Sequence, residues 1–338
     1  MFNQYSVVMS TKDKVLQYLE DIDSEYVSGQ KLAENLGMSR TAVWKAIADL
    51  RKSGAVIEAV TNRGYHIIRT TPQMSQKSMS EALPNLDVFY FDEIDSTNNY
   101  CKQLVAKGEK NNVLAVSSKQ LIGRGRLGRV FESPCGGVYF SLLLNTEKSS
   151  EDNLLVTSAA SVAVSRAIKK VCDKETQIKW VNDIYYNNKK VCGILTEGVI
   201  DMEAGTIGAM VVGIGINFST SLSAFDTELH SIVTSLYEGE ENVPFTVSQT
   251  QLVATVVNEL LLIWNNISWD KSFLNEYRDR SNVIGKYVDL YNDNKKKSGL
   301  VVDIDDSAHL LVKLEDTNQI IELNTGEVTL RLKKDKNN

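Results

Sequence analysis

Apolar residues recur at helical and strand-like spacings along most of this chain. In its first part, apolar residues three or four positions apart predict three helices, and a serine able to cap the first turn precedes the second and the third. Two short runs rich in β-branched residues around a tight turn then predict a hairpin. These elements are expected at residues 12–20, 29–36, 40–52, 56–60 and 65–68. Helix, short turn, helix and hairpin together predict a winged helix-turn-helix domain over residues 1–70.

A polar segment interrupts this pattern. Residues 71–86 are mostly polar and hold Pro72 and Pro84, two of the four prolines in the chain, which predicts a linker with about one helical turn. Beyond it the pattern is that of an α+β domain over residues 87–282. Its expected strands are 88–91, 113–117, 138–144, 178–180, 184–186, 191–197 and 210–218, and its expected helices are 97–107, 153–171, 250–265 and 270–280.

The last part of the chain consists of short apolar runs separated by turns. Five strands are expected, at 287–290, 299–304, 310–314, 320–323 and 328–332. Their spacing fits a small barrel over residues 283–338 better than an open sheet. The whole chain is therefore expected to belong to the α+β class, with a winged helix-turn-helix, a linker, a mixed-sheet domain and a barrel.

Length and composition narrow the class of protein. A chain of 338 residues exceeds what one hydrophobic core usually holds, and 43% hydrophobic with 24% charged residues is typical of a folded globular protein. No apolar run approaches the ~20 residues that span a bilayer, and the first residues lack the features of a secretory signal. The four cysteines are scattered and form no CxxC pair. We therefore expect a cytoplasmic protein with no membrane partner.

Charge is unevenly distributed along the chain. The formal net charge is −6, a poor overall match to a nucleic-acid polyanion. Residues 40–69, in contrast, contain six basic and only two acidic side chains. The predicted winged helix-turn-helix thus has a basic face, and we expect the acidic remainder to do different work.

The segment most indicative of chemistry is Gly123-Arg124-Gly125-Arg126-Leu127-Gly128-Arg129. Its glycines let the backbone approach a ligand, and its arginines are forked donors suited to phosphate or carboxylate. It is neither a Walker loop nor a Rossmann fingerprint, because it lacks the lysine of the first and the following helix of the second. We expect a loop that folds over an anionic ligand. The alternative is a mobile solvated loop.

Three further clusters carry polar or glycine residues. Lys179-Trp180-Val181-Asn182-Asp183 ends a predicted strand, and its lysine either lies on the surface with a packed stem or points a charge into a site. Ser96-Thr97-Asn98 begins a predicted helix, where it caps the helix and can also hold a small polar ligand. Gly213-Ile214-Gly215-Ile216-Asn217 places two glycines in a strand, which indicates close approach by a ligand or another segment.

Histidines and cysteines offer little for catalysis. His66, His230 and His309 fall one in each predicted region, so we expect neither a histidine-based metal site nor a Ser-His-Asp triad. The cysteines have no such partners either, which argues against a thiol nucleophile. The expected chemistry is therefore positional and electrostatic, in which a bound nucleotide reacts with a bound substrate.

Taken together, these segments resemble the biotin protein ligases, and specifically the bifunctional members that also repress the biotin operon. The resemblance covers nearly the whole chain, and the segments occur in the family's order. They are residues 96–98, Gln120 with 123–129, 179–183, 191–197, 213–217 and 326–331. The resemblance implies a class II synthetase-like catalytic domain and a C-terminal SH3-like barrel.

The resemblance also implies two half-reactions. Biotin attacks the α-phosphate of ATP, with Mg²⁺ and without a tightly bound metal, to give biotinyl-5′-AMP, and a lysine of biotin carboxyl carrier protein then takes the biotinyl group. The residues implied to bind biotin or the adenylate are Ser96, Thr97, Asn98, Gln120, Arg124, Gly125, Arg126 and Lys179. Of these, Arg126 and Lys179 are implied to be catalytic, because attack on phosphorus needs cations and alignment more than a protein nucleophile. Loop closure would exclude water from the anhydride.

Two positions depart from the family pattern. Val181 stands where the family usually has proline, and Phe131 stands where it usually has tryptophan. Val181 can loosen the backbone after Lys179, and Phe131 can alter how adenine or the loop packs. Neither change removes a charged side chain that is implied to bind the substrates. Asp183 is a hypothesis for the base that assists the incoming lysine.

The N-terminal segment resembles the repressor branch of the family. The residues expected to face DNA are Ser39, Arg40, Thr41, Trp44 and Lys45 on the second helix of the motif and Arg63 on the wing. One monomer offers few phosphate contacts, so operator binding should need a homodimer on a palindromic site. The resemblance implies that biotinyl-5′-AMP favours this dimer. The alternative is a winged helix that only packs on the enzyme.

Two other functions stay open at the level of sequence. One is a ligand-sensing repressor without ligase activity, against which the intact Arg126 and Lys179 speak. The other is a lipoate or octanoate ligase on the same fold, against which the glycine-arginine loop and the following lysine cluster speak.

Overall fold

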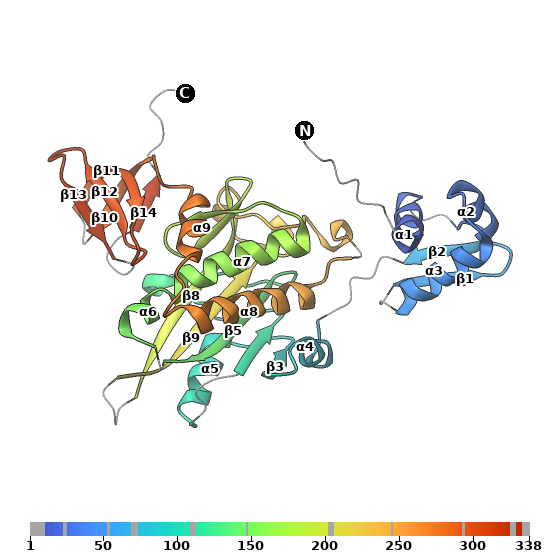
Figure 1. The fold of residues 1–338 in the computed structure, drawn as a ribbon, viewed down its shortest axis with the longest axis horizontal. Helices are drawn as coiled ribbons and strands as arrows, with labels where there is room; N and C mark the ends of the chain where they lie inside the picture. Colours follow the sequence, from blue (N-terminus) through green and yellow to red (C-terminus); the bar gives the residue numbers. More distant parts are fainter. Residues whose placement is uncertain are drawn as a thin grey trace. The chain divides into compact units, whose positions relative to one another are not determined.

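The computed structural model of the chain (Figure 1) describes residues 11–22, 26–52, 55–68, 74–108, 113–146, 148–201, 206–244, 246–292, 295–324 and 329–332. Contacts along the chain divide it into two compact units, residues 1–72 with 244–246 and residues 73–243 with 247–338. No helix in the described ranges is both long and apolar enough to cross a membrane.

The smaller unit consists of three helices and a β-hairpin. Its elements are α1 (Thr11–Asp21), α2 (Gly29–Asn35), α3 (Arg40–Lys52), β1 (Val56–Val60) and β2 (Gly64–Ile68), the two strands being antiparallel. The Ser28 hydroxyl accepts the backbone N–H of Lys31 at 3.1 Å and caps α2. Gly37 takes a positive φ in the turn before α3. The winged helix-turn-helix predicted from the apolar spacing is confirmed.

A seven-stranded mixed sheet forms the centre of the larger unit. Its order is β3-β4-β5-β9-β8-β7-β6, with β3 and β4 parallel and every other neighbouring pair antiparallel. The strands are β3 (Asp87–Phe91), β4 (Val113–Ser117), β5 (Val138–Asn145), β6 (Gln177–Lys179), β7 (Asp183–Tyr186), β8 (Lys189–Asp201) and β9 (Thr206–Ile216). Each overlaps a predicted strand, so the α+β class is confirmed.

Helices cover both faces of this sheet (Figure 1). Alternate residues of β4 lie on opposite faces of the sheet, because successive side chains of a strand point in opposite directions. Leu114 and Val116 join the core beneath α7 (Val156–Cys172) and α8 (Gln249–Asn266), whereas Val113 and Ala115 join a second core against α5 (Thr97–Val105). Further helices of this unit are α6 (Ser150–Leu154) and α9 (Phe273–Asp279).

Residues 74–86 differ from the predicted linker. They contain a helix, α4 (Gln76–Ala82), and Met74, Met79 and Leu83 are buried in the core of the larger unit. The linker prediction is wrong for these residues, because three apolar side chains at near-helical spacing anchor a segment whose composition is otherwise polar.

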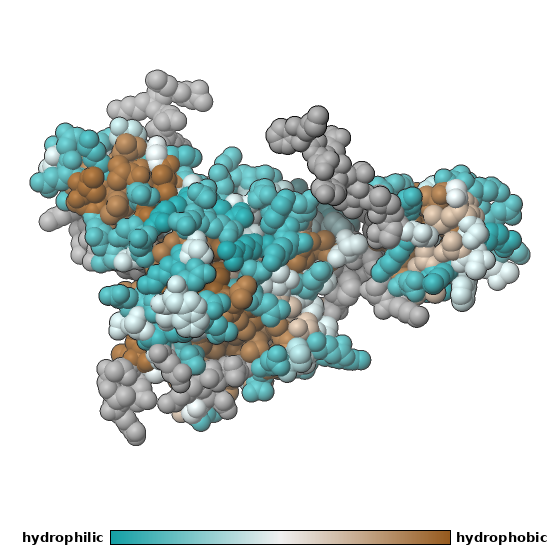
Figure 2. Space-filling view, in the orientation of Figure 1, coloured by the Kyte–Doolittle hydropathy of each residue, from teal (hydrophilic) through white to brown (hydrophobic). Residues whose placement is uncertain are grey.

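The C-terminal strands form an antiparallel sheet of order β13-β12-β11-β10-β14. They are β10 (Tyr287–Asn292), β11 (Lys295–Ile304), β12 (Leu310–Leu314), β13 (Ile320–Leu323) and β14 (Thr329–Leu332). Figure 2 shows an apolar area over this sheet with hydrophilic residues around it. The five antiparallel strands are as predicted, and the described pairings do not join β13 to β14 into a closed barrel. Residues 71–73 of the predicted linker and 326–328 of the C-terminal motif lie outside the described ranges.

Candidate active site

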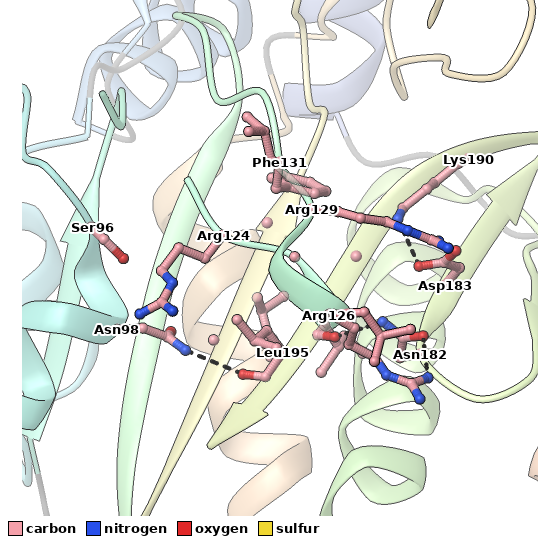
Figure 3. A pocket seen from close by; sticks show the side chains of 18 of the residues that line it. Ser96, Asn98, Arg124, Arg126, Arg129, Phe131, Asn182, Asp183, Lys190 and Leu195 are labelled. Carbon is pink, nitrogen blue, oxygen red and sulfur yellow. Dashed lines mark hydrogen bonds and ion pairs between the residues drawn. The ribbon is translucent and has the colours of Figure 1, made fainter. Parts of the chain in front are cut away.

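Two cavities that share lining residues lie beside the central sheet, and Figure 3 shows the residues around the first of them. The first, of about 180 Å³, is lined by the start of α5, loop 120–131, residues 179–183 and strands β8 and β9. The second, of about 430 Å³, is lined by loop 129–132, strands β7 and β8 and segment 225–233. The residues that line both cavities are Arg129, Val130, Phe131, Lys179, Asp183 and Lys190. Two adjoining cavities of this size can accept a ligand made of two linked parts.

The first turn of α5 contributes buried polar side chains to the first cavity. Ser96, Thr97 and Asn98 are at most 5% exposed. Ser96 Oγ accepts the backbone N–H of Asn99 and caps the helix, as expected. Gln120 Oε1 accepts both the N–H and the hydroxyl of Thr97, at 2.9 and 3.2 Å. The structure thus brings the four residues predicted to bind biotin to one place, and their binding role stays a prediction.

Asn98 is held by hydrogen bonds from two directions. Its Oδ1 accepts the Ser141 hydroxyl at 2.6 Å, and its Nδ2 donates to Glu197 Oε2 at 2.8 Å. Burial alone would raise the pKa of Glu197, but hydrogen bonds from Asn98 and Lys102 outweigh burial and hold that pKa below its usual value. Glu197 is therefore a fixed anion, and Asn98 presents one fixed orientation beside the cavity (Figure 3).

The glycine-arginine segment forms a short hairpin. Leu127 and Gly128 have φ values of 56° and 73°, and the Arg129 N–H donates to the Arg126 carbonyl at 3.2 Å, which is the geometry of a tight two-residue turn. A Cβ atom at Gly123 would lie 2.1 Å from the Phe131 carbonyl oxygen, so only glycine fits there. Leu127 is 65% exposed at the tip. The segment therefore carries its charges on an arm that borders the first cavity.

Arg124 and Arg126 of this hairpin contact different residues. Arg126 is part-buried and donates to Asn182 Oδ1 at 3.2 Å, and burial lowers the pKa of its guanidinium. Arg124 Nη1 lies 3.4 Å from Asn99 Oδ1 and 4.0 Å from Glu197 Oε1, on the α5 side of the cavity. Figure 3 shows the two guanidinium groups on opposite sides of the first cavity. Both predicted arginines, and Gly125 between them, line it.

Lys179 ends β6 and lines both cavities, which favours the interpretation of a site lysine over that of a surface lysine. Two hydrogen bonds anchor the backbone beyond it, and the effect of Val181 stays a prediction. The Tyr277 hydroxyl donates to the Val181 carbonyl at 3.0 Å, and Trp180 Nε1 donates to the Ala308 carbonyl of the C-terminal sheet at 3.0 Å. The peptide bond between Trp180 and Val181 is cis.

Lys190 is a site residue that the sequence did not predict. Its Nζ lies 2.7 Å from Asp183 Oδ1 and 5.5 Å from the centre of the Phe131 ring, facing both cavities. The carboxylate of Asp183, the hypothetical base, thus already forms an ion pair with Lys190. The second lysine of a pair after a turn is typical of a solvated hairpin, so the sequence offered no signal for it.

Glycines on two neighbouring strands make room for Phe131. A Cβ atom on Gly193 would lie 2.8 Å from the Phe131 ring, and one on Gly215 would lie 2.5 Å from it. The close approach predicted for the glycine-rich strand is therefore to an aromatic ring between the two cavities.

The residues predicted to face DNA are exposed in the smaller unit. Arg40, Thr41, Trp44 and Lys45 lie along one side of α3, and Trp44 is 64% exposed. The Ser39 hydroxyl accepts the Ala42 N–H at 3.1 Å and so caps this helix. The wing residue Arg63 lies over the Tyr26 ring at 4.7 Å. Arg40, Thr41 and Trp44 also line a groove that the turn of the hairpin closes.

Comparison with known proteins assigns the family. A profile of the Biotin/lipoate A/B protein ligase family matches residues 90–217, and one of an HTH domain matches residues 11–66. The bifunctional ligase/repressor BirA of Bacillus subtilis is 37% identical over 227 residues, which cover 66% of this chain and 69% of that protein. The chain belongs to the BirA family of bifunctional ligase/repressor proteins.

Two further relatives agree with membership of the BirA family. BirA of Escherichia coli is 28% identical over 313 residues, covering 91% of this chain and 94% of that protein. A biotin protein ligase from Aquifex aeolicus, solved in complex with biotin and ATP, superposes with a TM-score of 0.62 at 26% identity, covering 73% of this chain and 99% of the other. The larger unit therefore has the fold of a biotin protein ligase, and a helix-turn-helix is joined to it.

Proposed function

We propose that this protein makes biotinyl-5′-AMP from biotin and ATP and transfers the biotinyl group to a lysine of a biotin carboxyl carrier protein. The observation that carries the proposal is the pair of adjoining cavities with cationic side chains at their junction. Lys179 and Lys190 line both cavities, and Arg126 borders the first. A ligand with an acyl part in one cavity and a nucleotide part in the other would have its phosphate among these cations.

The chemistry follows from this placement of charge. The buried polar turn at Ser96–Asn98 and Gln120 holds the ring end of the acid, and its carboxylate attacks the α-phosphorus as pyrophosphate leaves. Charge then grows on the phosphate oxygens, where fixed cations stabilise it without reorganisation. The hairpin with Arg124 and Arg126 covers the anhydride and keeps water from it.

Mg²⁺ fits this site as a companion of ATP. Among the described residues, the only carboxylate that lines the first cavity is that of Asp183, and it already pairs with Lys190. Such a site provides no cage of protein oxygens, whereas Mg²⁺ usually takes its ligands from phosphate and water with one or two carboxylates. When bound, the ion would neutralise charge on the departing pyrophosphate.

Replacing Lys179 should abolish most of the biotinylation of a carrier domain. The protein, ATP, Mg²⁺, biotin and a carrier domain are incubated, and the carrier mass is measured over time. Lys179→Ala is expected to slow biotinylation by about 10²–10³-fold, because it removes one fixed cation from the phosphate. A variant that folds like the wild type and labels at the wild-type rate would exclude the assignment. Adding lipoate or octanoate as a competitor of biotin tests which of these acids the site prefers.

We further propose that the smaller unit binds operator DNA as a homodimer that biotinyl-5′-AMP favours. The exposed Arg40, Thr41, Trp44 and Lys45 on α3 and Arg63 on the wing support this role. Arg40→Ala is expected to weaken operator binding by about 1–3 kcal/mol, roughly 5- to 150-fold, because it removes a groove contact from each half-site.

The measurement is a DNA titration with and without the adenylate, followed by sedimentation for the dimer. The carrier-labelling assay serves as the control, since α3 belongs to the unit without the cavities. Equal DNA affinity in Arg40→Ala and wild type would remove Arg40 from the interface, and equal affinity with and without adenylate would refute the corepressor role.

A further inference from the structure

Three metal-ligating side chains converge on the C-terminal sheet, outside the two cavities. His309 Nδ1 lies 2.5 Å from Glu322 Oε1 and 3.3 Å from Asp305 Oδ2. One ligand atom from each residue lies within 4.8 Å of the others. Nδ1 is buried, yet neither close approach has the direction of a hydrogen bond. A ring nitrogen therefore faces two carboxylates without a proton-mediated contact to either.

The backbone fixes where these side chains point. Asp305 Oδ1 accepts the N–H groups of Ser307 and His309 at 2.9 and 2.8 Å, which leaves Oδ2 for the imidazole. Glu322 of β13 pairs with Leu311 of β12. Because Leu311 lies two residues after His309, the side chains of His309 and Glu322 share one face of the sheet. Oriented ligands of this kind bind metals more tightly than free side chains do.

We propose that Asp305, His309 and Glu322 form a binding site for a divalent transition-metal ion of the zinc class. One imidazole nitrogen and two carboxylate oxygens are a donor set that Zn²⁺ accepts, with water as the remaining ligand. Metal–ligand distances of ~2.0–2.2 Å require only small movements of ligand atoms that already lie this close. Glu322 is about half exposed, so the site is open to ions from solvent.

Hydrogen bonds connect the turn that contains Asp305 and His309 to the segment beside the cavities. The Ala308 carbonyl accepts the indole N–H of Trp180 at 3.0 Å, and the Ile304 carbonyl accepts Arg278 Nε at 2.6 Å. Trp180 follows Lys179 directly. An ion that cross-links Asp305 to His309 and Glu322 therefore stabilises the turn against which the lysine segment is anchored.

The test is a titration of the metal-free full-length protein with Zn²⁺ by calorimetry and with Co²⁺ by visible absorption. The wild type is expected to bind one ion that His309→Ala does not bind. Glu322→Gln is expected to lower the affinity for that ion at least about tenfold. Zn²⁺ should raise the unfolding temperature of the wild type and leave that of His309→Ala unchanged. His66→Ala, which removes a histidine of the smaller unit, is the matched control and should bind as the wild type does.

Equal ion counts and affinities for His309→Ala and wild type would overturn the proposal, and so would a wild type that binds no ion. If His309→Ala does not fold, Glu322→Gln decides the question, because its side chain is exposed and keeps its shape. The titration uses neither biotin nor ATP, so its outcome is independent of the proposed ligase activity.

Discussion

Arg126→Met is expected to slow adenylate formation by about 10²–10³-fold, comparable to the loss of one preorganised donor at a developing anion. The guanidinium is part-buried and donates to Asn182, and its pKa is lowered by burial. A cation held with little water interacts strongly with a phosphate that enters its cavity. Methionine keeps much of the length and apolar stem but carries no charge. Biotin-dependent exchange of pyrophosphate into ATP measures this step alone.

Arg126→Lys supplies the matched control for charge. It keeps a cation but loses the planar fork, so its exchange rate should lie between those of the wild type and the methionine variant. A methionine variant that exchanges within about tenfold of the wild type would show that Arg126 provides far less than a catalytic donor does.

Gly213→Ala is expected to raise the KM for biotin by about 5- to 150-fold with little change in the KM for ATP. A Cβ atom at this position would lie 2.0 Å from Asn98 Oδ1. Asn98 cannot move aside freely, because Ser141 and Glu197 hold both ends of its amide. Forcing such a contact into a packed site costs about 1–3 kcal/mol. Steady-state kinetics with each substrate varied in turn measure the two KM values.

Gly198→Ala is the matched variant for this experiment. Gly198 lies on β8, outside both cavities, and its added Cβ would lie 3.3 Å from Ile207 Cγ2, a side-chain methyl group rather than a held polar atom. Its kinetics should follow the wild type. If Gly213→Ala binds biotin as well as Gly198→Ala does, the acid does not lie against Asn98.

The order of elements was readable from the sequence because apolar spacing marks strands and helices directly. All seven strands of the central sheet and the helix-turn-helix overlap their predictions. Residues 74–86 were misread because composition was weighed above spacing. Their three buried apolar side chains matter more than the number of polar neighbours, since burial against α8 and the sheet anchors the segment.

The candidate site was only partly predictable, and Lys190 shows why. Asn187 and Asn188, between β7 and β8, both take the positive φ of a two-residue hairpin turn. The strands leaving the turn do not stay in simple register, because a bulge shifts the pairing from Tyr185 with Lys190 to Ile184 with Cys192. Alternation from the turn alone would place Asp183 opposite Cys192, whereas it lies opposite Gly193. A one-residue shift of this kind depends on tertiary packing and leaves no mark in composition.

The hydrophobic core of the larger unit runs without interruption into the C-terminal sheet. Val288, Val301 and Leu310 belong to the same cluster as Phe140 and Trp264. An engineer who wanted a compact biotin-tagging reagent from this sequence could not end the gene at residue 282. The shortened product would expose apolar surface that the C-terminal sheet covers in the full chain. The detachable piece is at the opposite end, where α1 to α3 keep a core of their own.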